Sequence, residues 1–197
     1  MSDPAAARLI LASTSAYRRE LLARLRVPFE ALGPDCDEHR LPDEPAQALA
    51  LRLAQLKADT VAARHPGSVV IGSDQVAVRG TEILGKPGTV ERCTAQLQQS
   101  SGHGVVFLTA VHIVDGRNAR AESHVDHTVV RFRSLDADEI ARYIAADAPL
   151  DCAGGFKAES LGITLFDRIE SNDPTALTGL PLIWVSAALR RAGIPVP

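Results

Sequence analysis

The chain has 197 residues, of which 46% are hydrophobic and 23% are charged, so it can bury the core of one domain or of two small lobes. The formal net charge of −3 disfavours general binding to DNA or RNA, because proteins that track nucleic-acid phosphates are usually basic. Three cysteines without a CxxC pair argue against a disulfide framework. Since the chain also lacks a signal-peptide pattern and an apolar run of membrane-spanning length, we expect a cytoplasmic protein that does not bind membranes.

The first half of the chain alternates strands and helices. The hydroxyls of Ser13-Thr14-Ser15 are typical of a helix start, and the leucines that follow have helical spacing until Pro28. The predicted elements are a strand at 9–12, a helix that ends before Pro28, a strand at 29–32, a polar loop at 33–42, a helix at 44–64 and a strand from Val69. This order of elements predicts an α/β architecture.

The second half of the chain adds longer strands. Residues 105–114 are apolar on both alternating faces, which is typical of a central strand. The predicted elements are a hairpin at 76–83, a rigid loop at 85–88, a helix at 89–100, strands at 105–114 and 124–132, a helix at 136–145, a glycine-containing loop at 149–161, a strand at 164–169 and a helix from Leu180 to Gly193. No linker is evident, so residues 1–197 are interpreted as one domain, whose two lobes would meet near 80–89.

Asp74 is the first candidate for chemistry. The run Val69-Val70-Ile71-Gly72-Ser73 leads directly into Asp74 and Gln75, which predicts a buried strand with these polar side chains at its carboxyl end. Ligands bind at that end of the strands in open α/β sheets. A carboxylate there can hold a metal ion or take a proton from water. The alternative is an ordinary turn-forming Asp after a strand.

A candidate anion site follows the first predicted strand. Backbone N–H groups at a helix start attract anions, and the hydroxyls of Ser13 and Ser15 and the guanidinium of Arg18 would add donors. The alternative is a serine cap beside a surface arginine, which the local pattern alone favours.

The loop Asp35-Cys36-Asp37-Glu38 supplies carboxylates that, together with Asp74, could hold Mg²⁺ or Mn²⁺. The alternative is a solvated acidic loop. Lys57, Lys86 and Lys157 are candidate phosphate ligands, since a triphosphate needs its charge neutralised before attack. For Lys57, which lies on the apolar side of a predicted helix, a snorkelling surface lysine is the usual explanation.

Taken in order, these motifs resemble the Maf family of nucleoside triphosphate pyrophosphatases. No single motif is specific, but their order and spacing together are, and they extend over nearly the whole chain. The matching segments are Leu9–Arg18, Asp37-Glu38, Lys57-Ala58, Gly72–Asp74, Gly85–Pro87 and Cys152–Pro181.

The resemblance implies hydrolysis of a nucleoside triphosphate between its α and β phosphates, with a divalent cation, Mg²⁺ or Mn²⁺, as cofactor. It also implies a mixed twisted sheet with flanking helices, two lobes around a cleft, and a possible homodimer. Asp74 takes the position of the proton acceptor, and Glu38 and Asp74 are the expected metal ligands. The implied substrate-binding residues are Ser13, Ser15, Arg18, Lys57, Lys86 and Lys157.

Three further residues point to a branch of that family. Tyr17, Gln75 and Glu159 match positions tied to base choice, and they resemble the branch that acts on 7-methyl-GTP. The positive charge of 7-methylguanine would favour stacking on Tyr17 and a nearby Glu159, while Gln75 could both donate to and accept from the base. The expected role is removal of modified nucleotides. The alternatives are a dTTP/UTP pyrophosphatase of the same family and a non-catalytic nucleotide-binding regulator of cell division.

Overall fold

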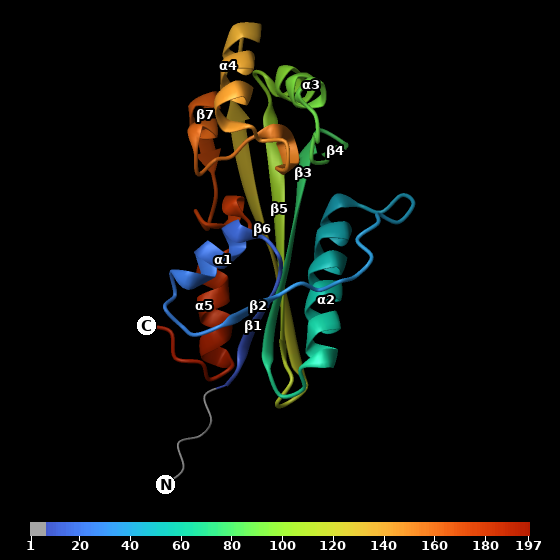
Figure 1. Ribbon diagram of the computed structural model, residues 1–197, viewed down its shortest axis with the longest axis vertical. Helices are drawn as coiled ribbons and strands as arrows, with labels where there is room; N and C mark the ends of the chain where they lie inside the picture. The colour runs from blue at the N-terminus through green and yellow to red at the C-terminus, as the bar shows by residue number, and fades with distance from the viewer. Residues whose placement is uncertain (1–6) are drawn as a thin grey trace.

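A mixed sheet of seven strands runs through the computed structural model, which describes residues 7–197 (Figure 1). The strand order is β2-β1-β3-β5-β6-β7, and β4 pairs with the last residues of β3, Ala77–Arg79. β1 is parallel to β2 and β3, whereas the other pairs are antiparallel. The strands are β1 Leu9–Ala12, β2 Glu30–Leu32, β3 Val69–Arg79, β4 Glu82–Leu84, β5 Gly104–Asp115, β6 Arg120–Phe132 and β7 Phe166–Glu170.

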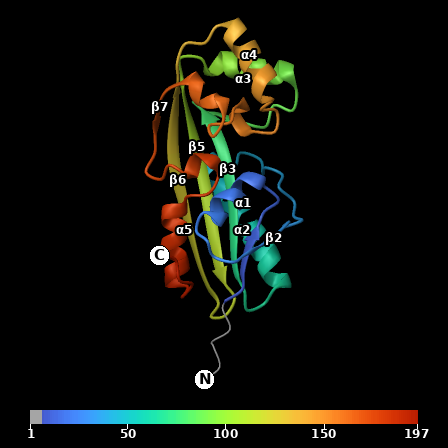
Figure 2. The ribbon, with the colours of Figure 1, turned by 60° about the vertical axis from the view of Figure 1, so that its left-hand side comes forward.

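Five α-helices and three short 3₁₀ turns flank the sheet in the described part of the chain. The helices are α1 Ala16–Ala23, α2 Ala46–Arg64, α3 Val90–Ser100, α4 Ala137–Asp147 and α5 Leu182–Arg191, and the turns are η1 Ala153–Gly155, η2 Leu161–Leu165 and η3 Ala176–Thr178. Figure 2 shows α3 and α4 at one end of the sheet and α1, α2 and α5 toward the other. Between residues 7 and 197, no helix combines the length and the apolar composition that a bilayer crossing requires.

One face of the sheet carries two separate apolar clusters. Val69 and Ile71 of β3 pack with α1 and α5, while Ala77 of the same strand packs with α3 and α4. These residues are an even number of positions apart, so they point to the same face. The two clusters therefore share β3 and β5 and lie at opposite ends of one face. The stretch 80–89 is one of several places where the chain turns within this arrangement, and a lobe boundary there stays an interpretation.

The other face of the sheet is covered by α2. Ala54 and Ala58 of this helix are fully buried, and a Cβ atom built on Gly72 of β3 would lie 2.2 Å from the carbonyl oxygen of Ala54 and 2.6 Å from the backbone nitrogen of Ala58. The missing side chain at position 72 thus allows the helix backbone to approach the strand closely.

The predicted fold class, a mixed sheet with flanking helices, is confirmed, and so is the central position of the strand around 105–114. The prediction that Asp74 ends a strand is wrong. β3 continues to Arg79 and forms the predicted hairpin with β4, because the residues after Gln75 pair with both β4 and β5. β6 also begins at Arg120, four residues before the predicted start at His124.

We expect Gly72→Ala to lower the free energy of unfolding by about 3 kcal/mol, because the new methyl group must push α2 away from β3. Urea unfolding followed by circular dichroism measures this change. Gly85→Ala is the matched control, since Gly85 has open space for a Cβ and no positive φ. Equal stability of the two variants would contradict the role given to Gly72.

Candidate active site

The site lies where one edge of β3 has no strand partner. β1 pairs with β3 only as far as Gly72, and β4 begins to pair at Ala77, so residues 73–76 have no strand on that edge among the described residues. The carboxyl end of β1 and the start of α1 lie beside this gap. A cavity of about 540 Å³ opens there. Asp74 therefore lies beside the carboxyl end of a parallel strand, but this strand is the neighbouring β1 and not β3 itself.

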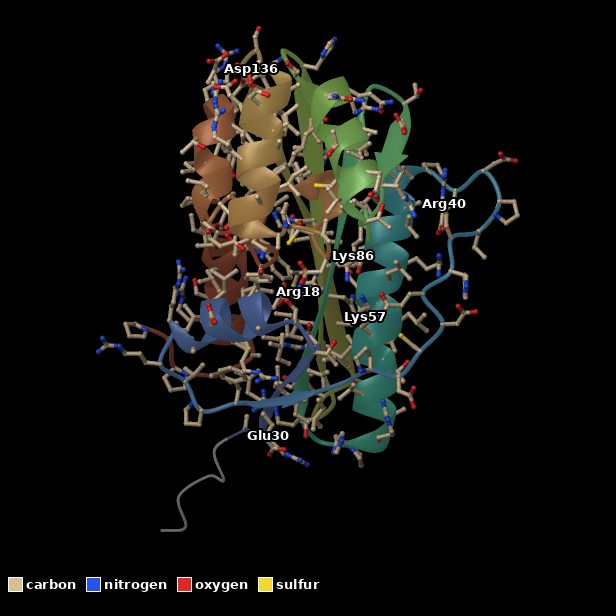
Figure 3. The ribbon with its side chains drawn as sticks, turned by 45° about the horizontal axis from the view of Figure 1, so that its top comes forward. Arg18, Glu30, Arg40, Lys57, Lys86 and Asp136 are labelled. Carbon is tan, nitrogen blue, oxygen red and sulfur yellow. The ribbon has the colours of Figure 1, made fainter. Side chains whose placement is uncertain are left out.

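All but one of the predicted site residues line this cavity. They come from α1, α2, β3 and four loops, and Figure 3 shows Arg18, Lys57 and Lys86 approaching the same central region from three of these segments. The predicted residues that line the cavity are Ser13, Ser15, Tyr17, Arg18, Glu38, Lys57, Asp74, Gln75, Lys86 and Glu159.

Lys57 joins the two acids of the site. Its side chain is 7% exposed, and its Nζ lies 2.7 Å from Asp74 Oδ1 and 2.7 Å from Glu38 Oε2. A buried ammonium needs such partners, because leaving it unpaired away from water is costly. Lys57 is therefore not a snorkelling surface lysine. The close contact of α2 with β3 at Gly72 brings Lys57 and Asp74 together.

The start of α1 is capped by serine hydroxyls at the cavity. Ser15 caps the helix by accepting a hydrogen bond from the Arg18 backbone N–H, and Ser13 Oγ accepts one from the Ser15 N–H. Arg18 Nε donates to the Gly179 carbonyl at 3.0 Å, which fixes the guanidinium at the cavity. Burial lowers the pKa of Arg18, and the charges of Asp74 and Glu38 oppose this shift. The guanidinium remains charged at neutral pH, since the pKa of arginine starts far above 7.

Lys86 approaches the cavity from the end of the sheet that carries α3 and α4. It is exposed on the loop between β4 and α3, and this loop is held by two contacts: Gly88 N–H donates to the Leu150 carbonyl at 2.9 Å, and Gln96 Nε2 donates to the Gly85 carbonyl at 3.1 Å. The cations of the site thus come from segments near both ends of the sheet.

Lys157 is the predicted residue that the structure places elsewhere. It does not line the cavity, and its Nζ donates at 2.8 Å to the Asp147 carbonyl at the end of α4. The last carbonyls of a helix lack partners within the helix and attract cations, so Lys157 caps α4 in this structure.

Gln75 differs from expectation in what it can offer a ligand. Its Nε2 lies within 2.9–3.1 Å of three acceptors, which are the Thr109 hydroxyl and the carbonyls of Ala176 and Leu177. The expectation that Gln75 both donates to and accepts from a base is therefore wrong for this structure. Only its Oε1 is left without a partner among residues 7–197, so Gln75 presents an acceptor to the cavity.

Tyr17 lies near two acidic side chains in the cavity. The pKa of the Tyr17 hydroxyl is raised to about 12, first by burial and then by the neighbouring Cys152, Asp151 and Glu159. All four residues line the cavity. An aromatic ring with nearby carboxylates is a favourable environment for a flat cation.

Sequence reasoning missed the residues that hold the cavity floor. Ser73 Oγ lies 2.9 Å from the Gly179 carbonyl, and Thr109 Oγ1 donates at 2.9 Å to the Ala176 carbonyl. Together with Gln75 and Arg18, they attach the η3 turn to the sheet and to α1. The signal was weak, because a buried Ser or Thr in a strand usually only satisfies its own hydroxyl.

The loop that carries Glu38 is clamped to α2. Arg52 donates to both carboxylate oxygens of Glu44, at 2.6 and 2.8 Å, and to the His39 carbonyl at 3.0 Å. These hydrogen bonds hold the pKa of Glu44 at about 2, below its ordinary value of 4.5. Glu38, next to His39, is thereby kept within reach of Lys57.

Four carboxylates line the cavity, and two of them, Asp74 and Glu38, lie together on Lys57. Across residues 7–197 no group of three or more His, Cys, Asp or Glu side chains is arranged to hold a metal ion. This donor set fits Mg²⁺ or Mn²⁺ shared with a phosphate ligand, since Mg²⁺ is usually bound by one or two carboxylates and completed by water and phosphate oxygens. It does not fit a closed structural site.

Comparison with known proteins gives consistent results. A family model described as Maf-like protein matches residues 8–192. A 7-methyl-GTP pyrophosphatase from Xanthomonas campestris pv. campestris is 57% identical, with 96% of this chain and 98% of the relative covered. One from Aromatoleum aromaticum is 53% identical, with the same coverage. The solved Staphylococcus aureus Ham1 protein is similar with a TM-score of 0.54 at 13% identity, covering 94% of this chain and 99% of that one, which shows a shared fold only.

We expect the stability that Glu44 gains from Arg52 to depend on pH. The folded-state pKa is lowered, so this stabilisation is complete above pH 4.5 and is lost as the pH falls toward 2. Glu44→Gln should therefore be less stable than the wild type by a constant amount from pH 7 to pH 5 and by a shrinking amount below pH 4.5. Urea unfolding at pH 7, 5, 4 and 3 measures the difference, with Glu20→Gln on the exposed side of α1 as control. A difference that stays constant down to pH 3 would contradict a stabilising interaction between Arg52 and the Glu44 carboxylate.

Proposed function

The chain belongs to the Maf-like protein family, and on this premise we propose that it is a nucleoside triphosphate pyrophosphatase whose preferred substrate is 7-methyl-GTP. It hydrolyses the bond between the α and β phosphates and releases a nucleoside monophosphate and pyrophosphate. The observation that carries the proposal is the gathering of Arg18, Lys57 and Lys86 around Asp74 in one cavity.

Asp74 is proposed as the base of the reaction. Its Oδ1 is held by Lys57, and its Oδ2 accepts no hydrogen bond from a described residue, so that oxygen can take a proton from water. The water oxygen attacks the α-phosphorus, and the bond from that phosphorus to the bridging oxygen breaks as pyrophosphate leaves. Arg18, Lys57 and Lys86 stabilise the charge on the phosphates and on the leaving group.

The proposed cofactor is Mg²⁺ or Mn²⁺, held by Asp74 and Glu38 together with phosphate oxygens. Such a cation would neutralise phosphate charge and make the phosphorus more susceptible to attack. Lys57 contacts both carboxylates, which supports a role for its ammonium group in neutralising phosphate charge beside the metal.

The preference for 7-methyl-GTP is supported by the side chains around Tyr17 in the cavity. Methylation at N7 gives guanine a positive charge, and Tyr17 with Asp151 and Glu159 forms an environment that favours a flat cation. Gln75 Oε1 would accept a hydrogen bond from an N–H of the base. The relatives that are 53–57% identical carry the name 7-methyl-GTP pyrophosphatase, which agrees with this choice.

We place the enzyme in the cytoplasm, where it would remove modified nucleotides from the pool. The free thiols of Cys36, Cys93 and Cys152 fit a reducing compartment. The homodimer implied by the family resemblance stays a prediction.

Release of pyrophosphate from 7-methyl-GTP, GTP, UTP and dTTP, with Mg²⁺ or Mn²⁺, tests the proposed function. We expect 7-methyl-GTP to give the highest kcat/KM. Asp74→Asn should lower kcat by about 10²–10⁴-fold, the usual value of a positioned acid or base, and still bind nucleotide. The matched control is Asp167→Asn, an exposed residue of β7 outside the cavity.

Three results would count against the proposal. Near-normal turnover of Asp74→Asn would remove Asp74 as the base. Faster release from UTP or dTTP than from 7-methyl-GTP would assign the enzyme to the pyrimidine branch of the family. Nucleotide binding without pyrophosphate release from any of the four would favour a regulator.

The charge of Glu159 should affect the methylated substrate more than the unmethylated one. We expect Glu159→Gln to lower the ratio of kcat/KM for 7-methyl-GTP over GTP by about threefold, a small effect because an exposed carboxylate is well screened by water. Glu82→Gln, an exposed residue outside the cavity, is the control. Equal losses on both substrates would show that Glu159 does not recognise the charge of the base.

A further inference from the structure

The Lys57 ammonium group contacts the two carboxylates that we propose as ligands of a divalent cation. Its Nζ is 2.7 Å from Asp74 Oδ1 and 2.7 Å from Glu38 Oε2. A cation bound by these two acids would therefore lie close to a positive charge, and one oxygen of each carboxylate is already paired with the ammonium group.

Other cations lie near the two acids as well. Arg18 is close enough for Asp74 and Glu38 to affect its pKa, and both Arg18 and Lys86 line the same cavity as Lys57. These positive charges weaken the attraction of the acid pair for an incoming dication, which an acid pair without such neighbours would attract strongly.

The flexible side chain of Lys57 also allows its ammonium group to exchange one partner for another. Its ammonium is a compact charge with three rotatable donors on a flexible stem. Because its side chain is only 7% exposed, it must keep an anionic partner if it leaves the carboxylates. The phosphates of a bound nucleotide would supply that partner within the same cavity.

We propose that Lys57 is an internal counter-ion that keeps the free protein from binding a divalent cation at Asp74 and Glu38. When nucleotide and metal enter together, the ammonium group exchanges its carboxylate partners for the phosphates. The species that binds is therefore the metal–nucleotide complex. The second statement rests on the proposed function, whereas the first concerns the protein alone.

Mn²⁺ binding to the protein without nucleotide tests the first statement. Isothermal titration calorimetry, together with the electron paramagnetic resonance signal of unbound Mn²⁺, gives the dissociation constant. We expect weak binding by the wild type and binding at least about tenfold tighter by Lys57→Met, since the acid pair then lacks the cation in contact with it. Lys57→Arg keeps the charge and should keep binding weak.

Two controls locate the effect. Lys86→Met removes a cavity lysine that forms no ion pair with either acid, and it should raise the affinity for Mn²⁺ by much less than Lys57→Met does. The double variant Lys57→Met with Asp74→Asn should lose the gain that Lys57→Met alone produces. Thermal unfolding checks that each variant is folded, and Lys57→Gln replaces Lys57→Met if the latter is not.

Tight Mn²⁺ binding by the wild type, or no gain in Lys57→Met and Lys57→Gln, would overturn the proposal. A gain that persists in the double variant would also overturn it, because the metal would then bind elsewhere. None of these results depends on catalysis. Failure of the proposed function would instead appear as absent pyrophosphate release by the wild type.

Discussion

The close approach of α2 to β3 at Gly72 is the constraint on which the site depends. With no side chain at this position, the backbone of α2 near Ala54 and Ala58 lies against the strand. Lys57 then lies beside Asp74, two residues further along β3, and forms an ion pair that is shielded from water. A bulkier residue at position 72 would separate the helix from the strand and leave both charges without their partner, so packing and chemistry share one requirement here.

The second requirement is that β1 is short. Because β1 ends at Ala12 and β4 starts to pair only at Ala77, the middle of β3 has one open edge, and residues from both faces of the sheet can reach a single cavity. Asp74 comes from the face covered by α2, whereas Gln75 comes from the face covered by the η3 turn. A fully paired β3 would keep these side chains on opposite sides of the sheet.

The site residues were singled out only by the order of the motifs along the chain, whereas local patterns in the sequence were sufficient for most elements of the fold. They failed where the answer depends on pairing between distant segments. The position of Asp74 relative to a strand end depends on where β1 stops pairing, which no residue near Asp74 encodes. The partners of Lys57 and Lys157 were equally hidden, since one lysine in a helix and one in a glycine-rich loop gave no sign that the first binds two acids and the second caps α4. The residue-by-residue reading favoured the ordinary interpretation at each position, and only the joint order of the motifs favoured a site.

In the proposed function, Arg18, Lys57 and Lys86 bind the phosphates, while Tyr17 and Glu159 face the base, and all five residues line the same cavity. A nucleotide with a methylated guanine carries negative charge on its phosphates and positive charge on its ring, so these two groups of residues would together favour one orientation of the substrate. An unmethylated base would lose the attraction to Glu159 but keep the phosphate contacts. On this assignment base preference and catalysis depend on different residues, so that each could change without the other.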